Sequence, residues 1–92
     1  MRDRIKELID HVANPRRPWA DMEVMTGIGH DKWNNICRGR QRANDEVIEK
    51  LGELWPQYVF WLVTGKTDER HGQVSPALER IARDLKSVQK VG

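Results

Sequence analysis

The side chains best suited to chemistry lie between residues 30 and 42, where polar groups are followed by basic ones. Four polar side chains recur at the spacing of one side of a helix, and we call them the polar face: His30, Asp31, Asn34 and Asn35. The major groove of DNA admits a helix and displays hydrogen-bond donors and acceptors on every base pair. Asparagine suits adenine, because its amide donates and accepts at once. The four residues are therefore candidates for contact with bases.

An arginine-rich segment follows the polar face directly. Residues 38–42, here called the arginine loop, read Arg-Gly-Arg-Gln-Arg and contain no acid. Guanidinium groups donate several hydrogen bonds to phosphate oxygens, so we expect a nucleic-acid backbone to be contacted by Arg38, Arg40 and Arg42. Lys32 and the Arg16–Arg17 pair extend the same candidate set.

Two short helices must position these groups. Residues 19–26 and 30–38 predict helices, and Gly27-Ile28-Gly29 between them predicts a tight turn. Trp33, Ile36 and Cys37 share the side of the second helix opposite the polar face. Packing of that apolar side on the first helix, with Ile28 in the angle between the two, would leave the polar face pointing outward.

The rest of the chain also predicts helices and no confident strand. A first helix ends at Asn14-Pro15, a fourth begins after the cap Asn44 and ends at Pro56, and a last one begins after Ser75 with Pro76. The buried side of the fourth helix is expected to comprise Val47, Ile48, Leu51, Leu54 and Trp55. Residues 58–63 suit a strand or a helix, and we expect a helix because no second strand exists to pair with them. Residues 65–73 predict a polar loop.

At this point the sequence resembles the helix-turn-helix regulators of the lambda-repressor and Cro type. The residues that carry the resemblance are GIGHDKWNNICRG at 27–39 and PQYVFWLVTGK at 56–66, which is similar to the WLxTG segment of a phage-repressor subgroup. It covers about residues 3–66. Two positions depart from the family pattern: Glu23 replaces a small residue, and Trp19 replaces a phosphate-binding glutamine or serine. The indole N–H of Trp19 could still donate to phosphate.

The resemblance implies an all-α domain of five or six helices that binds double-stranded DNA. We expect residues 1–66 to form the DNA-binding domain, 67–74 a linker and 75–92 a C-terminal helix. The implied activity is transcriptional regulation by a repressor that occludes a promoter, with a homodimer on a palindromic operator. The alternative is a helical protein-interaction module on the same fold, of the antitoxin or phage-inhibitor kind. Its working surfaces would be the acidic residues between 45 and 53 and the apolar side of the last helix.

The last helix carries an apolar stripe at alternating spacings of four and three residues. The stripe comprises Val74, Leu78, Ile81, Leu85 and Val88. Two heptads are too short to be stable alone, so the stripe must be covered. It packs either on the core of its own domain or on the same stripe of a second subunit, and dimerisation is the preferred interpretation.

Composition limits the other possibilities. Ninety-two residues with 38% apolar content predict one small domain. Net charge is +3 over residues 1–43 and −3 over 44–73, a segregation that favours a polyanion-facing side. Cys37 is the only cysteine, which fits the reducing cytoplasm, and the longest apolar run of six residues cannot span a membrane. No metal-ligand spacing or catalytic arrangement is present, so we expect no enzyme activity, metal, cofactor or small-molecule ligand.

Overall fold

The computed structural model describes the backbone of residues 1–91 and the side chains of residues 1–86, and within them the chain is all-α. Its helices are, in order, α1 (Arg2–Val12), α2 (Pro18–Thr26), α3 (His30–Cys37), α4 (Asp45–Leu54), α5 (Val59–Thr64) and α6 (Pro76–Val91). Two single 3₁₀ turns, η1 (Pro56–Tyr58) and η2 (Glu69–His71), complete the path. The expected all-α fold class is confirmed, and residues 58–63 are helical apart from the first.

Helix boundaries follow from residues that supply or remove hydrogen bonds. The side-chain oxygen of Asn44 accepts from the backbone N–H of Val47 at 3.1 Å, and the Ser75 hydroxyl accepts from that of Leu78 at 3.1 Å. Both residues therefore cap helices as expected. Pro18 and Pro76 occupy first helical positions, where a missing N–H costs nothing.

The first five helices enclose one core. Its largest fully buried side chain is Trp33 of α3, which contributes alongside apolar residues of every other helix from α1 to α5. The other core residues are Ile5, Leu8, Ile9, Ala13, Met22, Ile28, Ile36, Cys37, Val47, Leu51, Tyr58, Trp61 and Leu62. The N-terminal helix also fastens α5, because Nε of Arg4 donates to the carbonyl oxygen of Leu62 at 2.8 Å.

Some details differ from the expected pattern. Of the five residues expected on the buried side of α4, Leu54 is 40% exposed, and Ile48 and Trp55 are only partly buried. The helix ends at Leu54, and the chain then turns through η1, so Tyr58 fills the core position instead. The expected polar loop at 65–73 contains η2, closed by backbone hydrogen bonds between Asp68 and Gln73.

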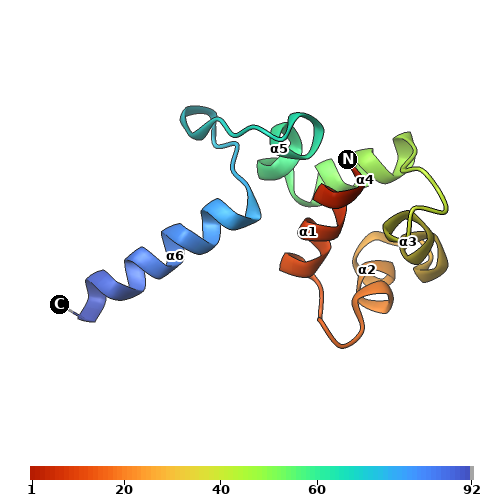
Figure 1. Ribbon diagram of the computed structural model, residues 1–92, viewed down its shortest axis with the longest axis horizontal. Helices are drawn as coiled ribbons and strands as arrows, with labels where there is room; N and C mark the ends of the chain where they lie inside the picture. The colour runs from red at the N-terminus through yellow and green to blue at the C-terminus, as the bar shows by residue number, and fades with distance from the viewer. Residues whose placement is uncertain (92) are drawn as a thin grey trace.

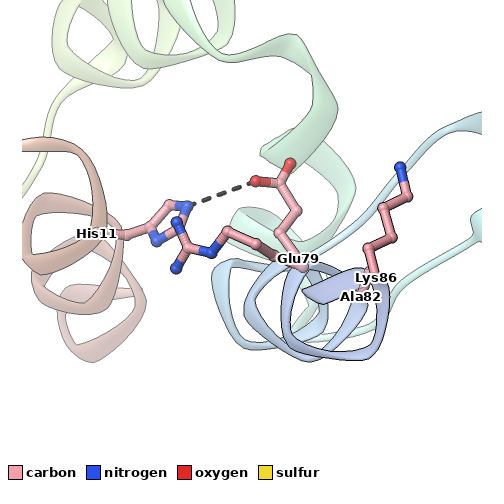
Figure 2. Close-up of a pocket in the computed structure, with 5 residues that line it drawn as sticks. His11, Glu79, Ala82 and Lys86 are labelled. Atoms are coloured by element: carbon pink, nitrogen blue, oxygen red, sulfur yellow. Dashed lines mark ion pairs between the residues drawn. The ribbon is translucent and has the colours of Figure 1, made fainter. Parts of the chain in front are cut away.

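The C-terminal helix projects from this core (Figure 1). The carboxylate of Glu79 on α6 accepts a hydrogen bond from the Tyr58 hydroxyl at 2.7 Å. Nε2 of His11, at the end of α1, lies 3.4 Å from the same carboxylate oxygen (Figure 2). Residues beyond the first turns of α6 are exposed through Lys86, so the helix is held to the domain near its N-terminal end.

Because α6 projects from the core, the molecule is elongated, with principal extents of 46 × 29 × 20 Å (Figure 1). Within the described part of the chain, no helix is long and apolar enough to cross a membrane.

Candidate nucleic-acid interface

The turn between α2 and α3 is set by two glycines and a buried isoleucine. Gly27 ends α2 with a left-handed φ of 75°, a conformation that side chains other than glycine rarely adopt. Gly29 then precedes the first residue of α3. Ile28 between them is 6% exposed and fills the angle between the helices, as the sequence predicts. The two helices are therefore held at a defined angle.

The hydroxyl of Thr26 holds this corner from inside. Thr26 is 5% exposed, and its hydroxyl donates to the carbonyl oxygen of Met22 at 2.5 Å. The same oxygen accepts from the backbone N–H of Ile28 at 3.1 Å and from the indole N–H of Trp33 at 3.2 Å. The single donor and both acceptor sites of the Thr26 hydroxyl are therefore occupied. Sequence reasoning missed this residue, although a threonine directly before a turn glycine is a known local acceptor pattern.

The third helix presents the polar face on its outer side. Trp33, Ile36 and Cys37 are buried, as predicted. His30 and Asp31 are exposed, while Asn34 and Asn35 are partly buried. The four polar residues lie together on the side of α3 that does not pack in the core, where a groove of DNA could reach them.

Glu23 of α2 occupies the start of this face. Its carboxylate accepts from the backbone N–H of His30 at 3.0 Å and lies 2.7 Å from Nδ1 of the same residue. Nε2 of His30 lies 3.3 Å from a carboxylate oxygen of Asp31. Glu23 therefore supplies the N-terminal cap that Gly29 cannot provide. This explains why an acidic residue stands where the resembled family has a small one.

These contacts shift the ionisation of both partners. The hydrogen bond to Glu23, aided by the charges of Asp31 and Glu23, raises the pKa of His30 above its ordinary value of 6.5. The hydrogen bonds from the His30 side chain and backbone lower the pKa of Glu23 below 4.5. The imidazolium form of His30 is favoured, and its positive charge offsets the two neighbouring carboxylates of Glu23 and Asp31.

The end of α3 is tied to the arginine loop. Nε of Arg38 donates to the side-chain oxygen of Asn34 at 2.6 Å, which leaves the amide nitrogen of Asn34 as a donor. The backbone oxygen of Asn35 accepts from the N–H of Arg40 at 2.8 Å and from that of Gln41 at 3.3 Å. The loop thus folds back on the helix. Its arginine side chains are all exposed: Arg38, Arg40 and Arg42.

The remaining candidates for phosphate contact have different surroundings. Arg16 and Arg17 are exposed in the turn before α2, and the backbone N–H of Arg16 donates to the side chain of Asn14 at 2.9 Å. Trp19 is partly buried against the core. Nζ of Lys32 lies 3.9 Å from the Glu46 carboxylate, so this lysine has an acidic neighbour from α4.

Glu46 belongs to an acidic hollow next to the turn. It has a volume of about 250 Å³ and is lined by the turn residues 26–28 and by four residues of α4: Glu46, Glu49, Lys50 and Glu53. The hollow meets the candidate phosphate-contacting set at Lys32, which lies beside Glu46. Among the described residues, no group of three or more His, Cys, Asp or Glu could hold a metal ion.

A phage protein shares this fold. The chain is similar to the solved structure of Pf6r from the filamentous phage Pf6 of Pseudomonas aeruginosa PA01, with a TM-score of 0.71 and 29% sequence identity. The similarity covers 92% of this chain and 95% of that one, and so includes α6 as well as the helix-turn-helix. No family model matches the sequence, and no curated protein matches it.

Removal of the Thr26 hydroxyl should lower the stability of the folded protein by a measurable amount. Thr26→Val keeps the shape but leaves the N–H groups of Trp33 and Ile28 buried without an acceptor. We expect the free energy of unfolding to fall by about 2 kcal/mol in urea denaturation. Thr26→Ser keeps the hydroxyl and removes one methyl group, which should cost only about 0.8 kcal/mol. Equal stability of the valine variant and the wild type would contradict this role.

The His30 contacts predict a specific pH response. In an NMR titration, the midpoint of His30 should lie above 6.5, and Glu23→Gln should lower it toward 6.5 by more than Asp31→Asn does. Because the folded pKa of His30 is raised, the stabilisation it gives is complete below 6.5 and is lost as pH rises through the folded value. The stabilisation from Glu23 is present above pH 4.5 and is lost as pH falls through its lowered value. A His30 midpoint that Glu23→Gln leaves unchanged would refute the contact.

Proposed function

We propose that this chain is a sequence-specific double-stranded DNA-binding regulator of transcription, and not an enzyme. One observation carries the proposal. The polar face of α3 is held outward by Trp33 and Thr26, and the exposed arginine loop is folded directly against the end of the same helix. Base-reading groups and phosphate-binding groups are thus adjacent and rigidly related, as major-groove recognition by a helix requires.

Within the polar face, the two asparagines differ in what they can offer. The Asn34 oxygen is already used by Arg38, so this side chain offers mainly its donors. The side chain of Asn35 has no hydrogen-bond partner among the described residues. It therefore keeps both the donor and the acceptor needed to pair with adenine. We assign Asn35 the main base contact, with His30, Asp31 and Asn34 beside it. The backbone contacts are assigned to the arginine loop, with Arg16, Arg17, Trp19 and Lys32 as the outer part of the set.

The proposed mechanism is occlusion in the cytoplasm, as a repressor bound over a promoter blocks polymerase. The resemblance to phage repressors and the structural similarity to a phage protein support a regulator of phage type. The proposed partner is a palindromic operator, with one half-site for each subunit of a homodimer.

Exposed apolar residues on α6 support the homodimer. Ile81 and Leu85 are 56% and 58% exposed and do not pack in the core of their own domain. With Val74, Leu78 and Ala82 they line a hollow of about 430 Å³. Val88, the last member of the predicted stripe, lies outside the residues whose side chains are described. A two-fold interface uses the same surface on both subunits, so the stripe of one subunit could pack against the stripe of the other.

The acidic hollow favours a second function. Glu46, Glu49 and Glu53 give the α4 side of the turn a negative surface that could bind a basic protein. A protein-interaction module of this kind needs no contact between the arginine loop and phosphate. Its affinity for duplex DNA would be negligible and its salt response flat, whereas the DNA-binding function requires affinity that falls steeply with salt.

Two substitutions separate base reading from phosphate binding. After an operator is selected from a random duplex library, Asn35→Ala should relax the preference at one base pair by about 1–3 kcal/mol. Arg40→Ala should weaken all sequences alike. Competition binding with single-base operator variants measures both effects. An unchanged base preference in Asn35→Ala would show that the face is assigned wrongly.

The dimer is tested by a charge on the α6 stripe. Leu85→Asp places a carboxylate in the proposed interface, and sedimentation should show a shift from dimer to monomer. Asp84→Asn changes a charge on the neighbouring position of the same helix and should leave the mass unaltered. A Leu85→Asp protein with the same sedimenting mass as the wild type would rule out this interface.

A further inference from the structure

A second basic element lies beside the arginine loop. A hollow of about 400 Å³ separates the first turn of α1 from the segment that joins α3 to α4. Its lining includes two arginines, Arg2 from α1 and Arg42 from the arginine loop, and its apolar lining includes Ile5 and Ile36. The two arginines are forty residues apart in the sequence, and the fold brings both to the lining of one hollow.

The guanidinium of Arg2 lies over Gly39. A β-carbon at this position would collide with Nη1 of Arg2, so the close approach uses the absence of a side chain there. Gly39 also has a left-handed φ of 78°, which independently favours glycine. The contact places a cation from α1 against the backbone of the arginine loop, at the hollow that Gln41 and Arg42 also line.

The charge of Arg2 remains available to a ligand. Its Nε lies 3.9 Å from the carboxylate of Asp3, and the two side chains are 56% and 91% exposed. An ion pair this open contributes little, because water screens it. A phosphate entering the hollow would lie next to two exposed arginines, and guanidinium groups bind phosphate oxygens more tightly than neutral groups do.

We propose that Arg2 is a further backbone-contacting residue and that Arg2 and Arg42 together bind a phosphate of the DNA duplex. The inference rests on the proposed DNA-binding function and extends it from the helix-turn-helix to the start of α1. In this arrangement α1 adds a contact next to the arginine loop, so the duplex backbone is held by two separate segments of the chain.

The test is the salt dependence of binding to a duplex of random sequence. Each phosphate contact contributes about 0.9 to the slope of log affinity against log salt. Arg2→Gln should lower that slope by about 0.9, and Arg2→Lys, which keeps the charge, should restore most of it. Arg70→Gln is the matched control, because it removes an equal charge from η2, on the opposite side of the domain from the arginine loop (Figure 1). This variant should leave the slope unchanged.

Arg40→Gln separates this inference from the proposed function. If Arg40→Gln lowers the slope while Arg2→Gln behaves as Arg70→Gln does, Arg2 does not contact the duplex and the proposed function stands. If the wild type shows no salt-dependent binding to any duplex, the proposed function and this inference both fail. Thermal unfolding of each variant confirms that the comparison is made between folded proteins; a destabilised Arg2→Gln is replaced by Arg2→Met, with the same slope criterion.

Discussion

The hydrogen bond between the Trp33 indole and the Thr26 hydroxyl is the contact on which the remaining geometry depends. Trp33 is fully buried, and with Ile36 and Cys37 it defines the side of α3 that faces the core. The directed N–H···O contact adds a second constraint on the same orientation, because it requires one edge of the indole to face the end of α2. The rotation of α3 in turn decides which side chains point away from the core. A hydrophobic contact and a polar one thus act together to set the orientation of this helix.

Much of the fold could be predicted because its signals are local. Asn44 and Ser75 cap helices through atoms three residues away, and both prolines at helix starts act through their own ring. The inward side of α3 follows from the spacing of Trp33, Ile36 and Cys37, which one helix turn defines. The start and end of a short buried helix are harder to predict, so the 3₁₀ turn before α5 and the exposure of Leu54 were not anticipated.

The features that sequence reasoning missed all involve residues that meet only after the chain has turned. Glu23 reaches His30 across the reversal at Gly27, and its role could be noticed only as a departure from a family pattern. The hydroxyl of Thr26 has three hydrogen-bond partners, and the one from Trp33 forms only because α2 and α3 pack against each other. Arg2 meets Gly39 through contact between α1 and the end of α3, and no periodicity in the sequence indicates that contact.

The attachment of α6 has a consequence for how far apart two DNA-reading units can stand. One carboxylate, that of Glu79, receives the Tyr58 hydroxyl and faces the His11 ring, and it anchors the first turns of a helix whose remaining length projects freely. The contacts at this carboxylate, together with the buried Ser75 and Pro76, therefore help to fix the angle at which the helix leaves the domain. In the proposed dimer, a small tilt at this joint would be magnified along the projecting helix into a change of operator spacing. In that dimer, Tyr58 would therefore help to set the operator spacing without contacting a base.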